Sequence, residues 1–165
     1  MSASVRLAVA SDAPSMAAIG SATDGSDVVV EEANARSLVR SEFYAGLVQK
    51  HAASVYVVEV GGSVVGFVVL QQESHHTVVG QNPVKLWQMY VAPAHHGSGV
   101  ASQLMSVTMD HARKHLHDVV WLGVSEHNAR GIAFYRKHGF KALGLHEVGA
   151  GGHAHQDIVM SCAAQ

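Results

Sequence analysis

A short glycine-containing segment, residues 96–101, has the residue types and the spacing of an anion-binding loop. It contains Gly97 and Gly99 and lies between a strand-forming run and a helical pattern that begins at Ser98. Glycines at such a junction let backbone N–H groups point into one space, and the start of a helix adds a positive partial charge. That combination suits a pyrophosphate. The loop lacks the third glycine of a G-x-G-x-x-G dinucleotide loop and the lysine of a Walker loop, and a plain glycine-rich turn explains it equally well in isolation.

Two motifs give this loop a context. The run Tyr90-Val91-Ala92-Pro93, followed by His96-x-x-Gly99-x-Ala101, resembles motif A of the GNAT superfamily of N-acetyltransferases. Further along the chain, Asn128-x-x-Gly131 and the run at residues 134–140 resemble motif B of the same superfamily. The order of the expected elements also matches that fold, so the resemblance covers nearly the whole chain.

A narrower resemblance involves the C-terminal part of the chain. The run at residues 121–128, the pair Gly144-x-His146 and the segment Gln156-Asp157-x-x-Met160 are similar to PaiA-type polyamine acetyltransferases. This resemblance implies a small polyamine as the acceptor, with spermidine or spermine as the first substrates to test.

The GNAT resemblance implies acetyl-coenzyme A (acetyl-CoA) as cosubstrate and no metal. His96 stands where the family usually has Gln or Arg, and Ser98 stands where many members have Arg or Lys. We therefore expect backbone N–H groups, more than side-chain charge, to bind the pyrophosphate. The expected coenzyme contacts are Met89, Tyr90, Val91, His96, Gly97, Ser98, Gly99, Val100, Ala101, Asn128 and Tyr135.

Acetyl transfer to an amine requires a deprotonated amine, a polarised thioester carbonyl and a proton for the departing thiolate. In the family a main-chain N–H at the end of the strand before the loop, here residues 89–91, polarises the carbonyl. Tyr135 matches the motif B tyrosine near the coenzyme sulfur, and a phenol with a pKa of about 10 is a suitable general acid. Packing against Ile132 is the alternative role for Tyr135. Asn128 is expected to contact the pantetheine arm, to cap a helix, or both.

The general base is less defined by the sequence. Glu126 is the first candidate, acting directly or through water, and a solvated loop carboxylate is the alternative. Glu73 and His146 are weaker candidates for the same role. Glu42, Glu73 and His146 are the predicted acceptor-binding residues. Carboxylates such as those of Glu42 and Glu73 attract a polyamine, and His146 belongs to the segment that is similar to PaiA-type enzymes. Glu31, Glu32 and Glu42 also fit a solvated helix face.

Histidine is unusually common, with 13 residues in the chain. His111 and His115 have a spacing of four, and His153-x-His155 adds a second pair that can hold a metal. No cysteine or acidic cluster completes a zinc pattern, so we expect solvent-facing histidines and no metal site.

Elements that can position these residues follow from hydrophobic periodicity and turn chemistry. The pattern predicts an α/β (α+β) fold, a mixed and mostly antiparallel sheet of about seven strands flanked by about four helices, as in the GNAT acyltransferase fold. A single domain over residues 1–165 is expected. We predict strands at 5–9, 54–60, 63–71, 85–91, 118–124, 140–146 and 156–161, and helices from 11, 31, 98 and 128. Between them we expect an irregular stretch at 20–30, a hairpin turn at Gly61-Gly62 and a polar loop at 73–82. Leu38, Phe43, Leu47 and Val48 are predicted to form the apolar stripe of the second helix, and Gly139 is predicted to end the last helix.

Composition narrows the function classes. Apolar residues make up 48% and charged residues 15% of 165 residues, which is typical of a compact globular protein. The net charge of −2 disfavours nucleic acid and anionic membrane as partners. The single cysteine, Cys162, fits a reducing cytoplasm.

The leading hypothesis is an N-acetyltransferase acting on a primary amine through a ternary complex. Two alternative functions stay open: a protein N-terminal or lysine acetyltransferase, and a non-catalytic acyl-CoA sensor. A homodimer, which many relatives form, also stays open.

Overall fold

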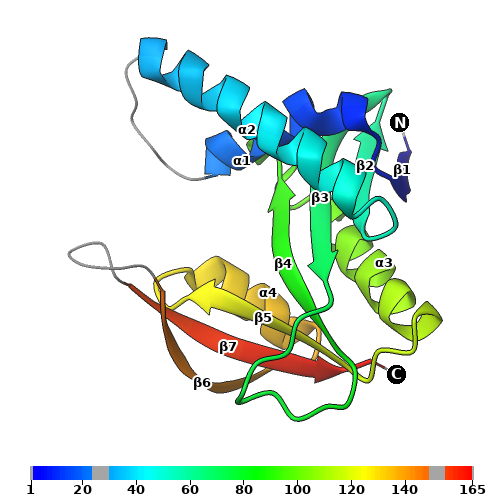
Figure 1. The fold of residues 1–165 in the computed structure, drawn as a ribbon, viewed down its shortest axis with the longest axis vertical. Coiled ribbons are helices and arrows are strands. Elements are labelled where there is room, and N and C mark those ends of the chain that lie inside the picture. The colour runs from blue at the N-terminus through cyan, green and yellow to red at the C-terminus, as the bar shows by residue number, and fades with distance from the viewer. Residues whose placement is uncertain (1, 24–29, 149–154, 165) are drawn as a thin grey trace. The chain divides into compact units, whose positions relative to one another are not determined.

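The computed structural model describes residues 2–23, 30–148 and 155–164. Within those residues the chain has seven strands and four α-helices (Figure 1). The strands are β1 (Ala3–Leu7), β2 (Val55–Val60), β3 (Ser63–Gln71), β4 (Pro83–Val91), β5 (Val119–Ser125), β6 (Lys141–Val148) and β7 (His155–Ala163). The helices are α1 (Ala13–Thr23), α2 (Val30–Lys50), α3 (Val100–Lys114) and α4 (Ala129–Lys137). The predicted fold class is confirmed.

The strands follow the order β1-β2-β3-β4-β5-β7-β6. β4 and β5 pair in parallel, whereas β1 with β2, β2 with β3, β5 with β7 and β6 with β7 pair antiparallel. The hairpin between β2 and β3 turns through Gly61 and Gly62, with φ angles of +59° and +80°. Both central residues of that turn need positive φ, which is why two glycines occupy it. The predicted hairpin is therefore confirmed.

The first helical region differs from the prediction. A 3₁₀ turn at Ala10–Asp12 leads into α1, which continues through Thr23, so residues 20–23 are helical where an irregular stretch was expected. Gly20 of α1 packs closely against α2, since a methyl group added at position 20 would lie only 3.2 Å from the Tyr44 hydroxyl. Packing between the two helices outweighs the weak helix propensity of glycine. The rest of the expected irregular stretch, residues 24–29, lies outside the described residues.

The chain forms two compact units. The first comprises Met1–Leu70 and Gln88–Thr108. Its core includes fully buried Val57 and Phe67 from the β2–β3 hairpin. Arg6 on β1 binds Asp12 through two bonds of 2.7 and 2.8 Å and binds Glu59 on β2 at 2.6 Å, which fixes the start of the chain to the sheet.

One correction concerns α2. Phe43 was placed on the apolar stripe of that helix, but its side chain is 45% exposed, and the neighbouring Tyr44 is buried instead. Tyr44 donates a hydrogen bond to Gln88 Oε1 on β4 at 2.8 Å and lies edge-on to Phe67. A tyrosine suits this position because its ring is buried while its hydroxyl finds a partner.

The second unit comprises Gln71–Trp87 and Met109–Gln165. Its strands β5, β7 and β6 are crossed on one face by the loop of residues 72–82 (Figure 1). Val78 of this loop packs with Trp121 of β5 and Val159 of β7, and the Trp121 indole Nε1 donates to the Glu73 carbonyl at 2.6 Å. Cys162, which alternates to the opposite face, contacts the His138 carbonyl at the end of α4. The single domain over residues 1–165 stays a prediction.

A second correction concerns the histidines, which were expected to face solvent. His111 is 6% exposed, and its ring lies 4.3 Å from the His115 ring and 5.9 Å from the His117 ring, measured between centroids. In the part of the chain that the structure describes, no group of three or more His, Cys, Asp or Glu residues is arranged to hold a metal ion. None of the helices in that part is both long and apolar enough to span a bilayer.

Candidate active site

The loop between β4 and α3 turns through two glycines in left-handed conformation. Gly97 has a φ of +76° and Gly99 a φ of +90°. A side chain at either position would be strained, because only glycine adopts such angles readily. A methyl group added at either glycine would meet no atom within 4 Å. Backbone conformation, and not crowding, therefore requires these glycines, and the space beside them is open.

The start of α3 presents backbone donors to this open space. The helical hydrogen-bond ladder begins with Gln103 N–H donating to the Gly99 carbonyl at 3.1 Å. Helix geometry leaves the N–H groups of Val100, Ala101 and Ser102 without a carbonyl one turn earlier. Residues 93–103 contain no Lys or Arg. The positive potential of the loop therefore comes from its N–H groups and the helix dipole, and this donor set fits a pyrophosphate.

His96 fastens the loop to the end of β4. Its Nε2 lies 2.9 Å from the Val91 carbonyl. Because a carbonyl oxygen can only accept, Nε2 carries a proton in this contact. The Ser98 hydroxyl donates to the His95 carbonyl one turn back. The side chains of His96 and Ser98 thus shape the loop, and their predicted contacts with the coenzyme stay predictions.

The end of β4 is fixed against β3. Ala92 N–H donates to the Val65 carbonyl at 2.8 Å, and Val91 is buried. A methyl group on Gly66 would lie 3.1 Å from the Tyr90 carbonyl, so the two strands approach closely here. Met89 and Tyr90 are half-buried. A backbone N–H of residues 89–91 as the donor to the thioester carbonyl stays a prediction.

Asn128 caps α4, as predicted. Its Oδ1 accepts a hydrogen bond from Gly131 N–H at 2.9 Å. A methyl group at position 131 would lie only 2.6 Å from the Asn128 Nδ2 and 2.9 Å from its Cγ. The Asn-x-x-Gly spacing therefore has a steric cause, since glycine leaves room for the amide to fold over the first turn. At the other end of α4, Gly139 has a φ of +90° and closes the helix, also as predicted.

Tyr135 lies on α4 with its ring half-buried. The ring is edge-on to Phe134 and Phe140, at centroid distances of 5.4 and 5.7 Å. The Tyr135 carbonyl accepts from Phe140 N–H at 3.0 Å, which ties the end of α4 to the start of β6. Packing thus holds the ring in a defined orientation, and this is compatible with both a packing role and an acid role.

Glu126 follows the last residue of β5. Its N–H donates to the Gln156 carbonyl at 3.1 Å, so its backbone is held by the chain entering β7. Its carboxylate is exposed and lies 3.5 Å from His127 Nε2. A general base and a solvated loop acid both fit this placement, and the role of Glu126 stays a prediction.

The three predicted acceptor-binding residues have different surroundings, and their role in binding the acceptor stays a prediction. Glu73 forms an ion pair with Lys85 at 3.1 Å and anchors Trp121 through its carbonyl, so it has a structural role. His146 on β6 is exposed, with its ring edge-on to His75 at 5.1 Å. Glu42 is an exposed residue of α2 in the first unit. Glu31 and Glu32 lie on α2, but their side chains are outside the described residues.

Residues 26–140 match the model of the Acetyltransferase (GNAT) family. The chain belongs to this family. Over 99 residues it is 34% identical to an uncharacterised N-acetyltransferase of Mycobacterium tuberculosis, a match that covers 60% of each chain. The chain thus spans about three fifths of the length of the curated relatives it matches.

Solved structures share the GNAT fold over nearly the whole chain. Ard1 from Thermoplasma volcanium superposes with a TM-score of 0.78 at 21% identity, covering 99% of this chain and 98% of that one. The PaiA N-acetyltransferase from Thermoplasma acidophilum, solved in complex with coenzyme A, gives a TM-score of 0.72 at 17% identity and covers 99% of both chains. At these identities the likeness establishes the fold alone.

His75 was not among the predicted site residues, but the structure places its ring in an unusual environment. Thr77 N–H lies 3.3 Å from its Nδ1. Since an N–H can only donate, Nδ1 accepts, and the neutral ring carries its proton on Nε2. That Nε2 is buried and has no hydrogen-bond partner among the described residues. Burial, and then the neighbouring His76, His146 and Lys85, lower the pKa of His75. No local pattern in the sequence signals this, because His146 and Lys85 are distant in the chain.

Proposed function

We propose that the protein transfers the acetyl group of acetyl-CoA to the nitrogen of a small cationic amine of the polyamine type. The observation that carries the proposal is the β4–α3 loop, where two left-handed glycines and the start of α3 present N–H donors to an open space. Membership of the GNAT family supports acetyl-CoA as the cosubstrate. The similarity of the C-terminal segment to PaiA-type enzymes supports the polyamine acceptor.

The proposed chemistry is direct transfer in a ternary complex. The neutral amine nitrogen attacks the thioester carbonyl carbon, the C–S bond breaks, and the thiolate leaves with the bonding electron pair. The amine gives up one proton to a base, for which Glu126 is the first candidate, and the thiolate takes one proton from Tyr135. A main-chain N–H of residues 89–91 stabilises the developing oxyanion. The products are an N-acetylamine and free coenzyme A.

The proposal is tested by mixing the protein with acetyl-CoA and an amine panel, and measuring free thiol release. We expect turnover with spermidine and spermine and little with peptides. Turnover with peptides alone would instead support a protein acetyltransferase. Binding of acetyl-CoA by calorimetry without turnover would support a sensor, and absence of binding by folded protein would refute coenzyme binding altogether.

The acid role makes a separate prediction. In Tyr135→Phe the ring keeps its packing but loses its proton, so we expect kcat to fall by about 10²-fold, while the KM for acetyl-CoA stays roughly the same. Phe134→Leu, a change on the same helix, controls for altered packing around α4. An unchanged kcat in Tyr135→Phe would leave the residue a packing role only.

A further inference from the structure

The loop of residues 72–82 in the second unit is closed at its base by hydrogen bonds. Gln72 Nε2 donates to Asn82 Oδ1 at 2.9 Å, which ties the two ends of the loop together. The Asp118 carboxylate accepts from Gln81 N–H at 2.6 Å and from Asn82 N–H at 3.0 Å. These backbone hydrogen bonds lower the pKa of Asp118, so its carboxylate stays ionised in mild acid. The base of the loop therefore stays closed over the pH range in which imidazoles titrate.

The middle of the loop lies on the sheet through apolar packing and three histidine rings. Val78 packs with Trp121 of β5, which is only 3% exposed. The histidine cluster consists of His75 and His76 on the loop and His146 on β6. The His75 ring is stacked on the His76 ring at 4.4 Å between centroids. It is edge-on to His146 at 5.1 Å and lies 5.2 Å from the Trp121 ring, so it joins the loop to both β5 and β6.

The hydrogen bonds of His75 fit a neutral ring. Its Nδ1 accepts from Thr77 N–H at 3.3 Å and lies 2.9 Å from the Thr77 hydroxyl. The proton of the neutral ring is on Nε2, which is buried and has no hydrogen-bond partner in the described part of the chain. Protonation would place a second N–H on Nδ1, directed at Thr77 N–H, and a positive charge on a ring that already has an unsatisfied donor. Moving the ring into water removes both penalties.

The charged groups around His75 oppose its protonation. Burial is the largest cause of its lowered pKa, and the neighbouring positive charges that lower it further belong to His76, His146 and Lys85. Glu73 acts in the opposite direction, but its carboxylate forms an ion pair with Lys85 at 3.1 Å.

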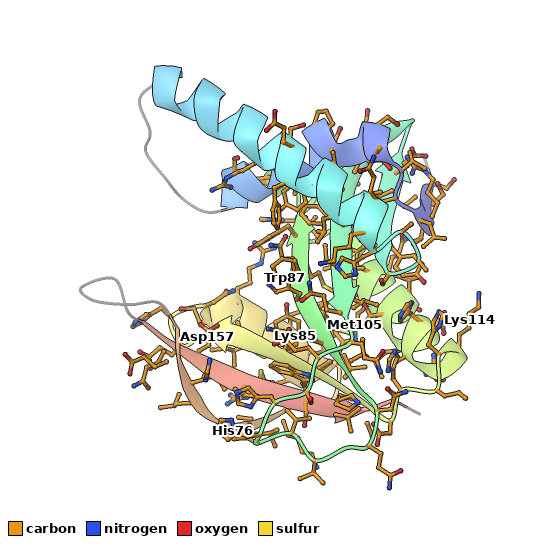
Figure 2. All side chains as sticks on the ribbon, in the orientation of Figure 1. His76, Lys85, Trp87, Met105, Lys114 and Asp157 are labelled. Atoms are coloured by element: carbon orange, nitrogen blue, oxygen red, sulfur yellow. The ribbon has the colours of Figure 1, made fainter. Side chains whose placement is uncertain are left out.

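The other strands add one carboxylate beside the cluster. Asp157 of β7 is directly opposite His146 in the sheet. Figure 2 shows His76 on the loop, Lys85 on β4 and Asp157 near the start of β7. Full protonation of the cluster would therefore bring four positive charges, those of the three rings and Lys85, next to two carboxylates, those of Glu73 and Asp157. Repulsion among these charges favours separation of the loop from the sheet.

We propose that loop 72–82 is a pH-sensitive lid, which lies over Trp121 at neutral pH and lifts from the sheet when the histidine cluster takes up protons. An imidazole in water takes up its proton near pH 6.5. Because the pKa of His75 in the closed state is below this value, its contribution to closure is complete above about pH 6.5. That contribution is lost progressively as the pH falls towards the lowered pKa. Lifting separates Val78 from the Trp121 indole and exposes the indole to water.

Hydrogen exchange of individual backbone amides, followed by NMR at pH 7.5 and pH 5.5, tests this lid. After correction for the intrinsic exchange rates, we expect the protection of Val78 N–H, which donates to the His75 carbonyl at 2.9 Å, to fall by about tenfold. Gln81 and Asn82 N–H should keep their protection, because Asp118 still holds them. Acrylamide should also quench tryptophan fluorescence more strongly at pH 5.5, since Trp121 becomes accessible.

Two variants of His75 separate this cluster from other titrating groups. His75→Gln takes up no proton, so the loss of protection between the two pH values should shrink to about twofold or less. His75→Lys carries a positive charge at both pH values, so Val78 N–H should exchange rapidly already at pH 7.5. His127→Gln is the matched control, because its side chain is 83% exposed, and it should respond as the wild-type protein does.

The outcomes distinguish lifting of the loop from unfolding of the domain, and none of them requires turnover. Loss of protection that is confined to the loop and abolished in His75→Gln supports the lid. Equal protection of Val78 N–H in the wild-type protein at both pH values would overturn it. A parallel loss of protection along β5 would show unfolding of the whole unit and would overturn it too. The same conclusion follows if His75→Gln and His127→Gln respond equally to pH.

Discussion

Asn128 combines two demands on a single side chain. Its Oδ1 caps α4 through Gly131 N–H, and its Nδ2 remains as the group for the proposed contact with the pantetheine arm. The cap requires the amide to lie directly over residue 131, where a methyl group would be 2.6 Å from Nδ2. The side chain of residue 131 therefore decides the orientation of residue 128.

Gly131→Ala tests this coupling. The methyl group forces the Asn128 amide away from the helix, which removes a cap worth about 1 kcal/mol, while alanine regains about the same amount in helix propensity. We expect little change in the free energy of unfolding but a several-fold increase in the KM for acetyl-CoA. Asn128→Ala should raise this KM as well, and the double variant should be no worse than the poorer single variant. Additive effects on the KM in this cycle would contradict a shared cause.

At the scale of elements, α3 depends on close packing against the sheet of the first unit. A methyl group on Gly66 of β3 would lie 3.0 Å from Val100 Cγ1 and 3.3 Å from Leu104 Cδ1, besides its contact with the Tyr90 carbonyl. Val100 and Leu104 are buried residues on one face of α3. The start of the helix, which carries the N–H donors, is therefore positioned by the absence of a side chain on β3.

Gly66→Ala should displace α3 and destabilise the protein. Overpacking of this kind costs about 1–3 kcal/mol, and we expect the affinity for acetyl-CoA to fall along with the free energy of unfolding. Gly46→Ala is the matched control, since position 46 of α2 has no neighbouring atom within 4 Å of an added methyl group. The control should be neutral or more stable by up to about 1 kcal/mol. Urea unfolding and coenzyme titration measure both effects, and a Gly66→Ala protein as stable as the Gly46→Ala protein would contradict this packing account.

At the scale of the whole molecule, buried histidine links stability to pH. The pKa of His111 is lowered from 6.5 to about 4. Burial of the ring is the largest cause, and the positive charges of His115, His117 and Lys114 lower the pKa further. The folded state therefore holds the ring neutral, whereas the unfolded chain protonates it below its ordinary pKa. The resulting stability is complete above about pH 6.5, is lost progressively as the pH falls from 6.5 towards 4, and is absent below the folded-state pKa.

We expect this residue to make unfolding easier at pH 5 than at pH 7, by on the order of 1–2 kcal/mol. His75 and His138 also have lowered pKa values, so the comparison must be made between variants. The difference in unfolding free energy between the two pH values should shrink in His111→Gln and persist in His127→Gln, whose side chain is 83% exposed. Asp12 and Asp118 do not interfere, because their pKa values lie below the usual 3.8. An equal pH difference in both variants would show that His111 is not responsible.

The sequence by itself determined the features that depend on neighbouring residues in the chain. Gly61 and Gly62 set the hairpin, Asn128 and Gly139 set the two ends of α4, and Gly97 and Gly99 set the loop before α3, because each acts through local backbone conformation. The tertiary structure decided the features that depend on strand register and burial. It placed Asp157 over Gly123 and beside His146, buried Tyr44 in place of Phe43, enclosed His111, and engaged Glu73 with Lys85. Those contacts join residues far apart in the chain, and no local pattern carries information about them.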